Sequence, residues 1–150
     1  MTAIGQRSLL CGVLLTIGCG SARAEDRVIG FVKSVNGHVT VTHGQLTYAA
    51  AEGVPVHEGD TLQTFWDGGL GVTFKDDTRI SLGPSSRATI PKFDFSPSEK
   101  RYGFVLRLIA GSMQYLSGLT AKLAPDAMTV ETPAATIGVR GTRFLARTDP

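Results

Sequence analysis

The chain has 150 residues, of which 42% are hydrophobic and 19% charged, and its formal net charge is +2. This length suits one domain, and the apolar share argues against a disordered chain. No apolar run reaches the roughly 18 residues that a membrane-spanning helix needs, which argues against a polytopic membrane protein.

The N-terminal segment has the three parts of a secretory signal peptide. It has a basic start, an apolar run over residues 9–17 and an A-x-A ending. We expect residues 1–24 to be removed by cleavage between Ala24 and Glu25, and the mature domain of residues 25–150 to be periplasmic. A lipoprotein signal acylated at Cys19 is the alternative.

The predicted mature chain contains no cysteine and is formally neutral. Cys11 and Cys19 both lie in the signal segment, so neither a disulfide nor a thiolate metal site is expected in the domain. Loss of Arg7 and Arg23 leaves 13 of the 15 basic residues, which balance the 13 acidic ones. Because Lys and Arg do not cluster, we expect no binding to nucleic acid.

Apolar and polar residues alternate with a period of two through the predicted domain. The alternating segments are 39–42, 70–74, 80–82, 88–90, 93–95, 104–109, 128–130, 137–139 and 144–146. This period buries one face of each strand, and Gly, Asn and Asp supply turns between the segments. We predict an all-β single domain of short stacked antiparallel strands, as a β-sandwich, a barrel or a β-helix-like solenoid. We place Ile137 in the core and expect Ile137→Asp to destabilise strongly.

The sequence contains no recognisable catalytic or metal-binding motif. His38 and His43 are five residues apart, and this odd spacing on a strand directs them to opposite faces. His57 has no second histidine at zincin spacing, and Asp76-Asp77 fits a tight turn. We therefore predict no metal ion, no cofactor and no enzymatic activity.

Four residues are candidates for contacting a partner. Trp66 and Asp67 lie in a predicted turn, where an exposed indole would indicate a sugar or protein contact, although a place at the rim of the core is commoner. Arg140 and Arg143 lie in a glycine-containing strand, where either could pair with a carboxylate of this chain or of a partner. For Arg140 we favour an internal pairing.

Several segments in this order resemble the FecR domain. They are GDTLQT at 59–64, GVTFKDDT at 71–78, ISLGPSS at 80–86, GSM at 111–113 and TPAATIGVRGTRF at 132–144. The resemblance runs from about residue 30 to residue 147. It implies a periplasmic all-β domain related to regulators that relay siderophore occupancy of an outer-membrane transporter to a sigma-factor system.

The resemblance and the residues together favour a non-enzymatic binding or scaffold module of the cell envelope. Its partner would be an envelope protein or glycan, and a strand edge near Pro150 would be open to pairing with a partner or a second copy. One alternative is a periplasmic sensor in FecR-type signalling. A second is an enzyme acting on an envelope polysaccharide, with carboxylates drawn from Glu58, Asp60, Asp76 and Asp77.

Overall fold

A computed structural model describes residues 26–140 and 143–149, most of which lie in strands. The strands are β1 (Val28–Asn36), β2 (Val39–His43), β3 (Leu46–Ala49), β4 (Pro55–His57), β5 (Thr61–Thr64), β6 (Gly69–Phe74), β7 (Arg79–Leu82), β8 (Arg87–Ser96), β9 (Arg101–Leu116), β10 (Met128–Glu131), β11 (Thr136–Gly138) and β12 (Arg143–Thr148). One short helix, α1 (Leu119–Leu123), and two 3₁₀ turns, η1 (Pro97–Glu99) and η2 (Pro125–Ala127), complete this part of the chain. None of its helices is long and apolar enough to cross a membrane.

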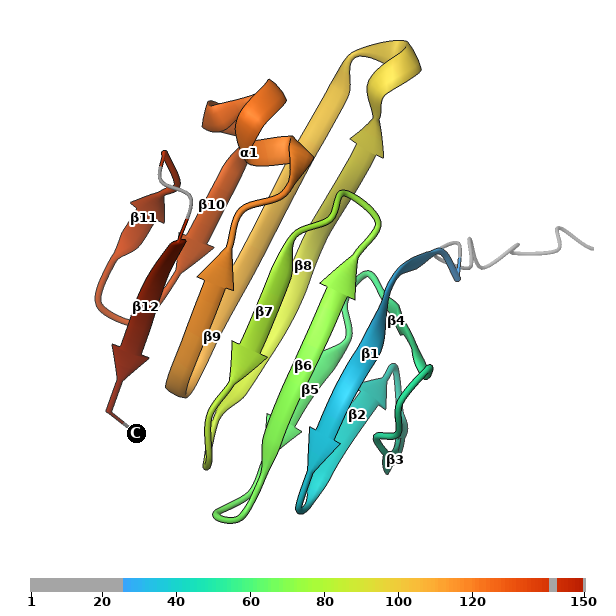
Figure 1. Ribbon diagram of the computed structural model, residues 1–150, viewed down its shortest axis with the longest axis vertical. Coiled ribbons are helices and arrows are strands. Elements are labelled where there is room, and N and C mark those ends of the chain that lie inside the picture. Colours follow the sequence, from blue (N-terminus) through green and yellow to red (C-terminus); the bar gives the residue numbers. More distant parts are fainter. Residues whose placement is uncertain (1–25, 141–142, 150) are drawn as a thin grey trace, which may run out of the picture.

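The predicted signal peptide lies outside the described residues, as do its cleavage site at Ala24 and Glu25 and the alternative acylation site at Cys19. The all-β, single-domain prediction for the remainder is confirmed. One sheet curls over on itself, so that its two halves pack face to face as the layers of a sandwich (Figure 1).

Strand β9 belongs to both layers. Its first arm pairs with β8 and β10, and its second arm pairs with β7 and β12. The first layer therefore has the order β4-β1-β6-β7-β9-β12, and the second has the order β3-β2-β5-β8-β9-β10-β11. Within the described residues, β12 is hydrogen-bonded only to β9, which leaves its other edge open.

The bend of β9 occurs at Gly111, where the backbone has a φ of +87°. A Cβ atom there would come within 2.6 Å of Ser86 Cα and 2.7 Å of the Ser85 carbonyl oxygen. The bend thus needs glycine for two reasons, because positive φ strains other residues and because the backbone of the β7–β8 turn packs directly against it.

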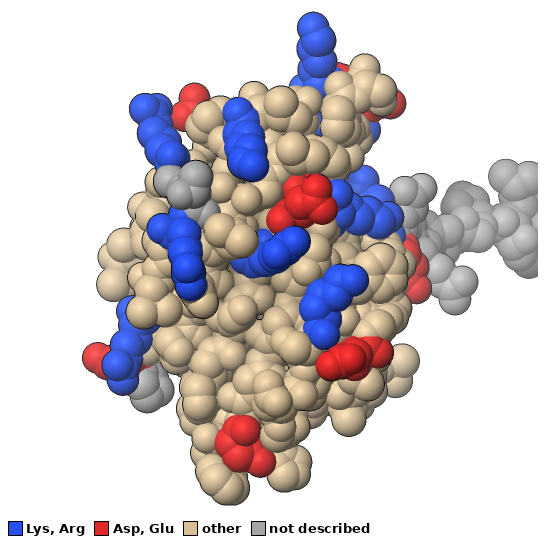
Figure 2. Space-filling model, in the orientation of Figure 1, with Lys and Arg blue, Asp and Glu red and all other residues tan. Residues whose placement is uncertain are grey.

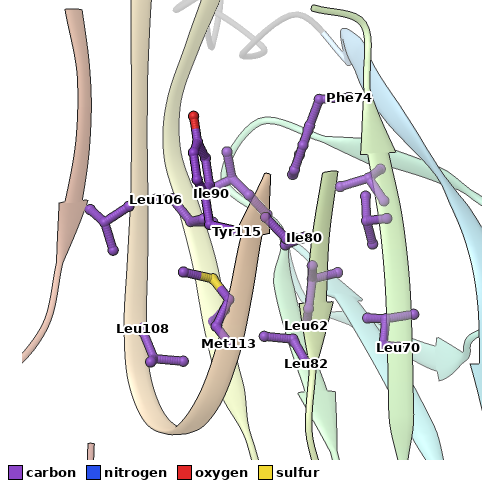
Figure 3. Close-up of a cluster of buried hydrophobic side chains, with 14 of the residues drawn as sticks. Leu62, Leu70, Phe74, Ile80, Leu82, Ile90, Leu106, Leu108, Met113 and Tyr115 are labelled. Atoms are coloured by element: carbon purple, nitrogen blue, oxygen red, sulfur yellow. The ribbon is translucent and has the colours of Figure 1, made fainter. Parts of the chain in front are cut away.

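The core fills the space between the two arms of β9 and the strands beside them. Leu106 and Leu108 on the first arm, and Met113 and Tyr115 on the second, have no exposed surface (Figure 3). Alternation along β9 directs these side chains inward from both arms. The sequence predicted this pattern for the first arm, within residues 104–109, but not for the second.

Three phenylalanines connect the layers further along the core. The ring of Phe104 on β9 lies 4.8 Å from that of Phe74 on β6 and 4.9 Å from that of Phe93 on β8, with edge-on geometry in both pairs. Because β6 belongs to the first layer and β8 to the second, this contact holds the layers together through aromatic packing.

The predicted burial of Ile137 is wrong. Among the described strands, β11 pairs only with β10 at the edge of the second layer, and Ile137 is 38% exposed. The chain reaches the core two residues later, where Val139 is buried and its N–H donates to the carbonyl of Met128. An edge strand of three residues has no second neighbour to cover it, and this explains the difference.

We expect Gly111→Ala to lower the free energy of unfolding by about 3 kcal/mol or more, because strain at positive φ adds to a clash with backbone. Gly44→Ala is the matched control, since Gly44 has a φ of +59° but no atom lies within 4 Å of the position that its Cβ would take. The control should lose only about 1 kcal/mol. Urea denaturation measures both, and equal losses would contradict the packing of the bend.

The register of the β11 segment can be tested with a pair of charge substitutions. Val139→Asp should cost about 3 kcal/mol or more, because it buries a carboxylate among apolar side chains. Ile137→Asp should cost about 1 kcal/mol, because the new charge reaches solvent. Thermal denaturation measures the two variants, and equally large losses would restore the burial of both residues that the sequence predicted.

Candidate functional site

Three turns meet at one end of the sandwich, at the bottom of Figure 1. They are the β1–β2 turn at Gly37, the β5–β6 turn at residues 65–68 and the β7–β8 turn at residues 83–86. We call residues 65–68, with the sequence FWDG, the aromatic turn. The sequence predicts turns at each of these positions, and the sheet topology brings them together.

Backbone hydrogen bonds hold the aromatic turn from both sides. The N–H of Phe65 donates to the carbonyl of His38 at 3.0 Å, and the carbonyl of Phe65 accepts from the N–H of Ser85 at 2.9 Å. The same carbonyl accepts from Gly68 at 2.9 Å, which closes the turn. Because both neighbouring turns bind the Phe65 backbone, the next residue, Trp66, is presented from a fixed main chain.

His38 and Asp67 add an ion pair beside the indole. Asp67 Oδ2 lies 2.8 Å from His38 Nδ1, and Asp67 Oδ1 accepts from the His38 N–H at 3.2 Å. The hydrogen bond from His38 lowers the pKa of Asp67 below its ordinary value. The predicted partner residue Asp67 is therefore engaged within the chain, where it helps to hold the aromatic turn.

The sequence favoured a position for Trp66 at the rim of the core. This prediction is wrong, because the Trp66 side chain is 79% exposed. Phe65 beside it is also exposed, and the two side chains form a ridge between two grooves. One groove, of about 420 Å³, is lined by Gly37, His38, Val39, Thr40, Ala49, Ala50, Phe65 and Trp66. The other, of about 390 Å³, is lined by Gln63, Thr64, Phe65, Trp66, Ser85, Ser86, Arg87, Ile109 and Ala110.

The chemistry of this ridge suits the binding of another molecule. A tryptophan offers a large apolar face and one N–H donor, and it loses little conformational entropy when it is held. Trp is also enriched among the residues that dominate binding energy at protein interfaces. The groove walls add apolar surface from Ala49 and Ala50 on one side, and Ile109 with the donor Arg87 on the other.

The two predicted arginines lie apart from the aromatic turn. Arg140 is 3.4 Å from Asp126 of the same chain, which is the internal pairing favoured for it, although both side chains are almost fully exposed. Arg143 lines a groove of about 250 Å³ together with Arg79, the first residue of β7, at the end of this strand that lies away from the β7–β8 turn.

On the face shown in Figure 2, Lys and Arg side chains lie interspersed with Asp and Glu.

Two of the four carboxylates considered for polysaccharide chemistry are buried. Asp76 accepts from the N–H and the hydroxyl of Thr78 at 3.0 and 2.8 Å, and from the N–H of Thr120 at 3.3 Å. Asp77 follows with a φ of +66°, which confirms the tight turn. Asp60 is also fully buried. Neither Asp60 nor Asp76 is open to a substrate.

A second polar cluster surrounds Asp60 and was not found from the sequence. His43 Nδ1 donates to Asp60 Oδ1 at 2.5 Å, and His43 Nε2 lies 2.6 Å from Asp26 Oδ1. The Asp60 hydrogen bond raises the pKa of His43 above its ordinary value. His57 packs against His43, with ring centroids 4.6 Å apart. We call Asp26, His43, His57 and Asp60 the histidine cluster.

Comparison with known families gives one match. The family described as FecR protein matches residues 60–150, which is more than half of the chain and includes the aromatic turn. The matched part begins later than the resemblance predicted from about residue 30. The searches of curated proteins and of solved structures gave no match.

The ion pair beside Trp66 predicts a shift in the titration of one carboxyl group. Because the folded pKa of Asp67 is lowered, the ion pair stabilises the protein above the ordinary Asp pKa, and this contribution is lost as the pH falls through the lowered value. In His38→Ala, the pKa of Asp67 should rise toward 3.8. NMR titration of the Asp67 carboxyl carbon measures this, with His43→Ala as a control that should leave it unchanged.

Proposed function

Because this chain belongs to the FecR family, we propose that it is a non-enzymatic binding module of the cell envelope, exported to the periplasm, and that the aromatic turn contacts a protein partner. The single observation that carries the proposal is Trp66, which is 79% exposed on a turn held from two sides by backbone hydrogen bonds. Exposed tryptophan is costly to leave in water, and a rigid main chain lowers the entropy lost on binding.

The family and the sequence both support the proposed location. FecR domains are typically found in the periplasm or associated with the envelope. The first 24 residues carry the signal-peptide pattern, which supports export of this chain. A domain free of cysteine and formally neutral is consistent with partners recognised by shape and apolar contact rather than by net charge.

The absence of catalytic activity is supported by what the polar groups do. The FecR family is regulatory rather than enzymatic. The buried carboxylates Asp60 and Asp76 are engaged by neighbouring donors. Glu58 is also occupied, since it accepts from the N–H of Phe93 at 2.8 Å and lies 3.5 Å from Arg27.

A protein partner fits the aromatic ridge better than a glycan does. Sugar rings stack on an indole that is accompanied by several polar groups able to bind hydroxyls. The groove beside His38 is lined largely by small apolar residues and backbone, and its Asp67 neighbour is already paired. Apolar side chains of a partner would fill this groove, while Gln63, Ser85 and Arg87 in the groove on the other side of Trp66 would bind polar groups of the same partner.

Family membership also favours a second candidate, a periplasmic sensor in a FecR-type signalling system. In that case the partner at the aromatic turn would be a component of the signalling pathway. Deletion of the gene should then change sigma-factor-dependent transcription, and the chromosomal Trp66→Ala variant should reproduce the deletion. If deletion leaves the transcriptome unchanged, the sensor hypothesis is rejected and the scaffold hypothesis remains.

Site-specific photocrosslinking in the native cell tests the binding surface. A photoreactive amino acid at position 66 should yield one dominant protein adduct, whereas the same amino acid at Leu145, which is 72% exposed on β12, should not. With the captured partner purified, Trp66→Ala should weaken binding about 30-fold or more, as expected for a hot-spot residue. Leu145→Ala should change the affinity less than about twofold.

The same experiment separates the other outcomes. Crosslinks at position 66 to envelope polysaccharide would replace the protein partner by a glycan. Equal crosslinking from positions 66 and 145, or equal affinities of the two alanine variants, would show that the aromatic turn is not the binding surface.

A further inference from the structure

The histidine cluster joins residues from separate parts of the chain. Asp26 lies just before the start of β1, His43 ends β2, and His57 ends β4. One potential ligand atom from each of these three residues lies within 4.8 Å of the other two. The sequence shows no sign of a metal site because His43 and its neighbour His38 are directed to opposite faces, whereas the fold brings His43 to His57.

The buried carboxylate of Asp60 binds the ring of His43 and faces the ring of His57. Its Oδ1 accepts from His43 Nδ1 at 2.5 Å. Its Oδ2 accepts from the main-chain N–H of His57 at 2.8 Å and lies 3.6 Å from His57 Nδ1. Both Nδ1 atoms therefore face Asp60, which leaves the two Nε2 atoms as the nitrogens available to a ligand.

This arrangement matches the way that proteins support metal-binding histidines. A histidine that binds a metal usually donates its other ring N–H to a carboxylate or a carbonyl, which sets the tautomer and the orientation of the ring. Asp60 is placed to do this for His43, and it has no exposed surface through which water could compete. The Nε2 of His43 points to the carboxylate of Asp26 at 2.6 Å.

His57 carries an independent sign of an incomplete polar site. Its Nδ1 is buried and has no hydrogen-bond partner. Buried polar side-chain atoms of this kind are uncommon, and each calls for a physical explanation. If a cation holds the ring through Nε2, then Nδ1–H can close on Asp60 Oδ2 from 3.6 Å, and the buried group is satisfied.

We propose that Asp26, His43 and His57 form a binding site for a first-row divalent transition-metal cation, with Zn²⁺ as its best fit. Two imidazole nitrogens with one carboxylate oxygen are a donor set that suits Zn²⁺. Mg²⁺ and Ca²⁺ require mainly oxygen ligands, so this set disfavours them. The site is separate from the aromatic turn and goes beyond the proposed function.

The ligand atoms of the cluster, which lie within 4.8 Å of one another, must adjust to hold the ion. Ligand atoms about 2.1 Å from a tetrahedral Zn²⁺ stand about 3.4 Å apart, so the Asp26–His43 contact must widen from 2.6 Å. The Asp26 side chain is 75% exposed and can move outward, while Asp60 stays in place. Three protein ligands leave the remaining coordination position open to solvent.

Occupation of the site would connect the chain before β1 to the ends of β2 and β4. Unfolding separates these three elements, so the ion should bind the folded state and raise the melting temperature. The site thus makes the stability of this edge of the sandwich depend on the supply of metal.

The test uses the protein purified without a histidine tag and stripped with a chelator. Calorimetric titration with Zn²⁺ should show one ion per chain, and thermal denaturation should show that Zn²⁺ raises the melting temperature. Mg²⁺ and Ca²⁺ should produce neither effect. His43→Gln and His57→Gln should weaken Zn²⁺ binding about 100-fold or more, and Asp26→Asn about 10-fold. His38→Gln is the matched control and should bind as the wild type does.

NMR of the imidazole nitrogens distinguishes loss of a ligand from loss of the fold. Zn²⁺ should shift the Nε2 signals of His43 and His57 in the wild type and leave those of His38 in place. Asp26→Asn, whose exposed side chain is not needed for folding, should weaken these shifts. No saturable Zn²⁺ binding, shifts at His38 alone, or a His38→Gln variant that loses as much affinity as His43→Gln would each overturn the proposal.

Discussion

One bent strand holds the two layers of this protein in place. The arms of β9 lie in the interior of opposite layers, and each arm has a hydrogen-bonded neighbour on both sides. The layers can face each other only if the strand reverses at Gly111, where positive φ and close contact with the β7–β8 turn leave no room for a side chain. Burial of Leu106, Leu108, Met113 and Tyr115 depends on this reversal.

A continuous set of hydrogen bonds connects that bend to the exposed tryptophan. Ser112, next to the bend, donates its N–H to Ser86 Oγ at 3.0 Å, and the N–H of Ser86 donates to Thr64 Oγ1 at 2.9 Å. Thr64 directly precedes the aromatic turn, whose Phe65 carbonyl accepts from Ser85. The position of Trp66 is thus set by the same contacts that close the sandwich, which makes the ridge a rigid feature of the fold rather than a loose loop.

Local alternation predicted the strands well because it reports only whether one face of a strand is buried. It identified the inward residues of β6, β7 and the first arm of β9, and the turns at Asp76-Asp77 and at residues 83–86, but not the inward residues of the second arm of β9. It could not show that one strand would serve two layers, since Leu108 and Met113 alternate in the same way as residues of any two successive strands. It also could not distinguish a strand at the edge of a sheet from one in its interior, and for this reason Ile137 was placed in the core.

The functional residues were harder to predict than the strands, because their neighbours come from distant parts of the chain. His43 and His57 meet because β2 and β4 end at the same place, although β2 pairs with β3 and β5 while β4 pairs with β1.

Two buried aspartates show how similar turns come to have different uses. Asp76 accepts three hydrogen bonds from Thr78 and Thr120, all of them neutral donors, so its carboxylate is consumed in holding the β6–β7 turn. Asp60 accepts only one main-chain N–H, and its remaining capacity is directed at two imidazoles. A carboxylate that orients titratable rings does more than close a turn, because each ring still has a second nitrogen to offer. That unused capacity, and not the number of acidic residues, distinguishes a site able to bind a cation from a structural turn.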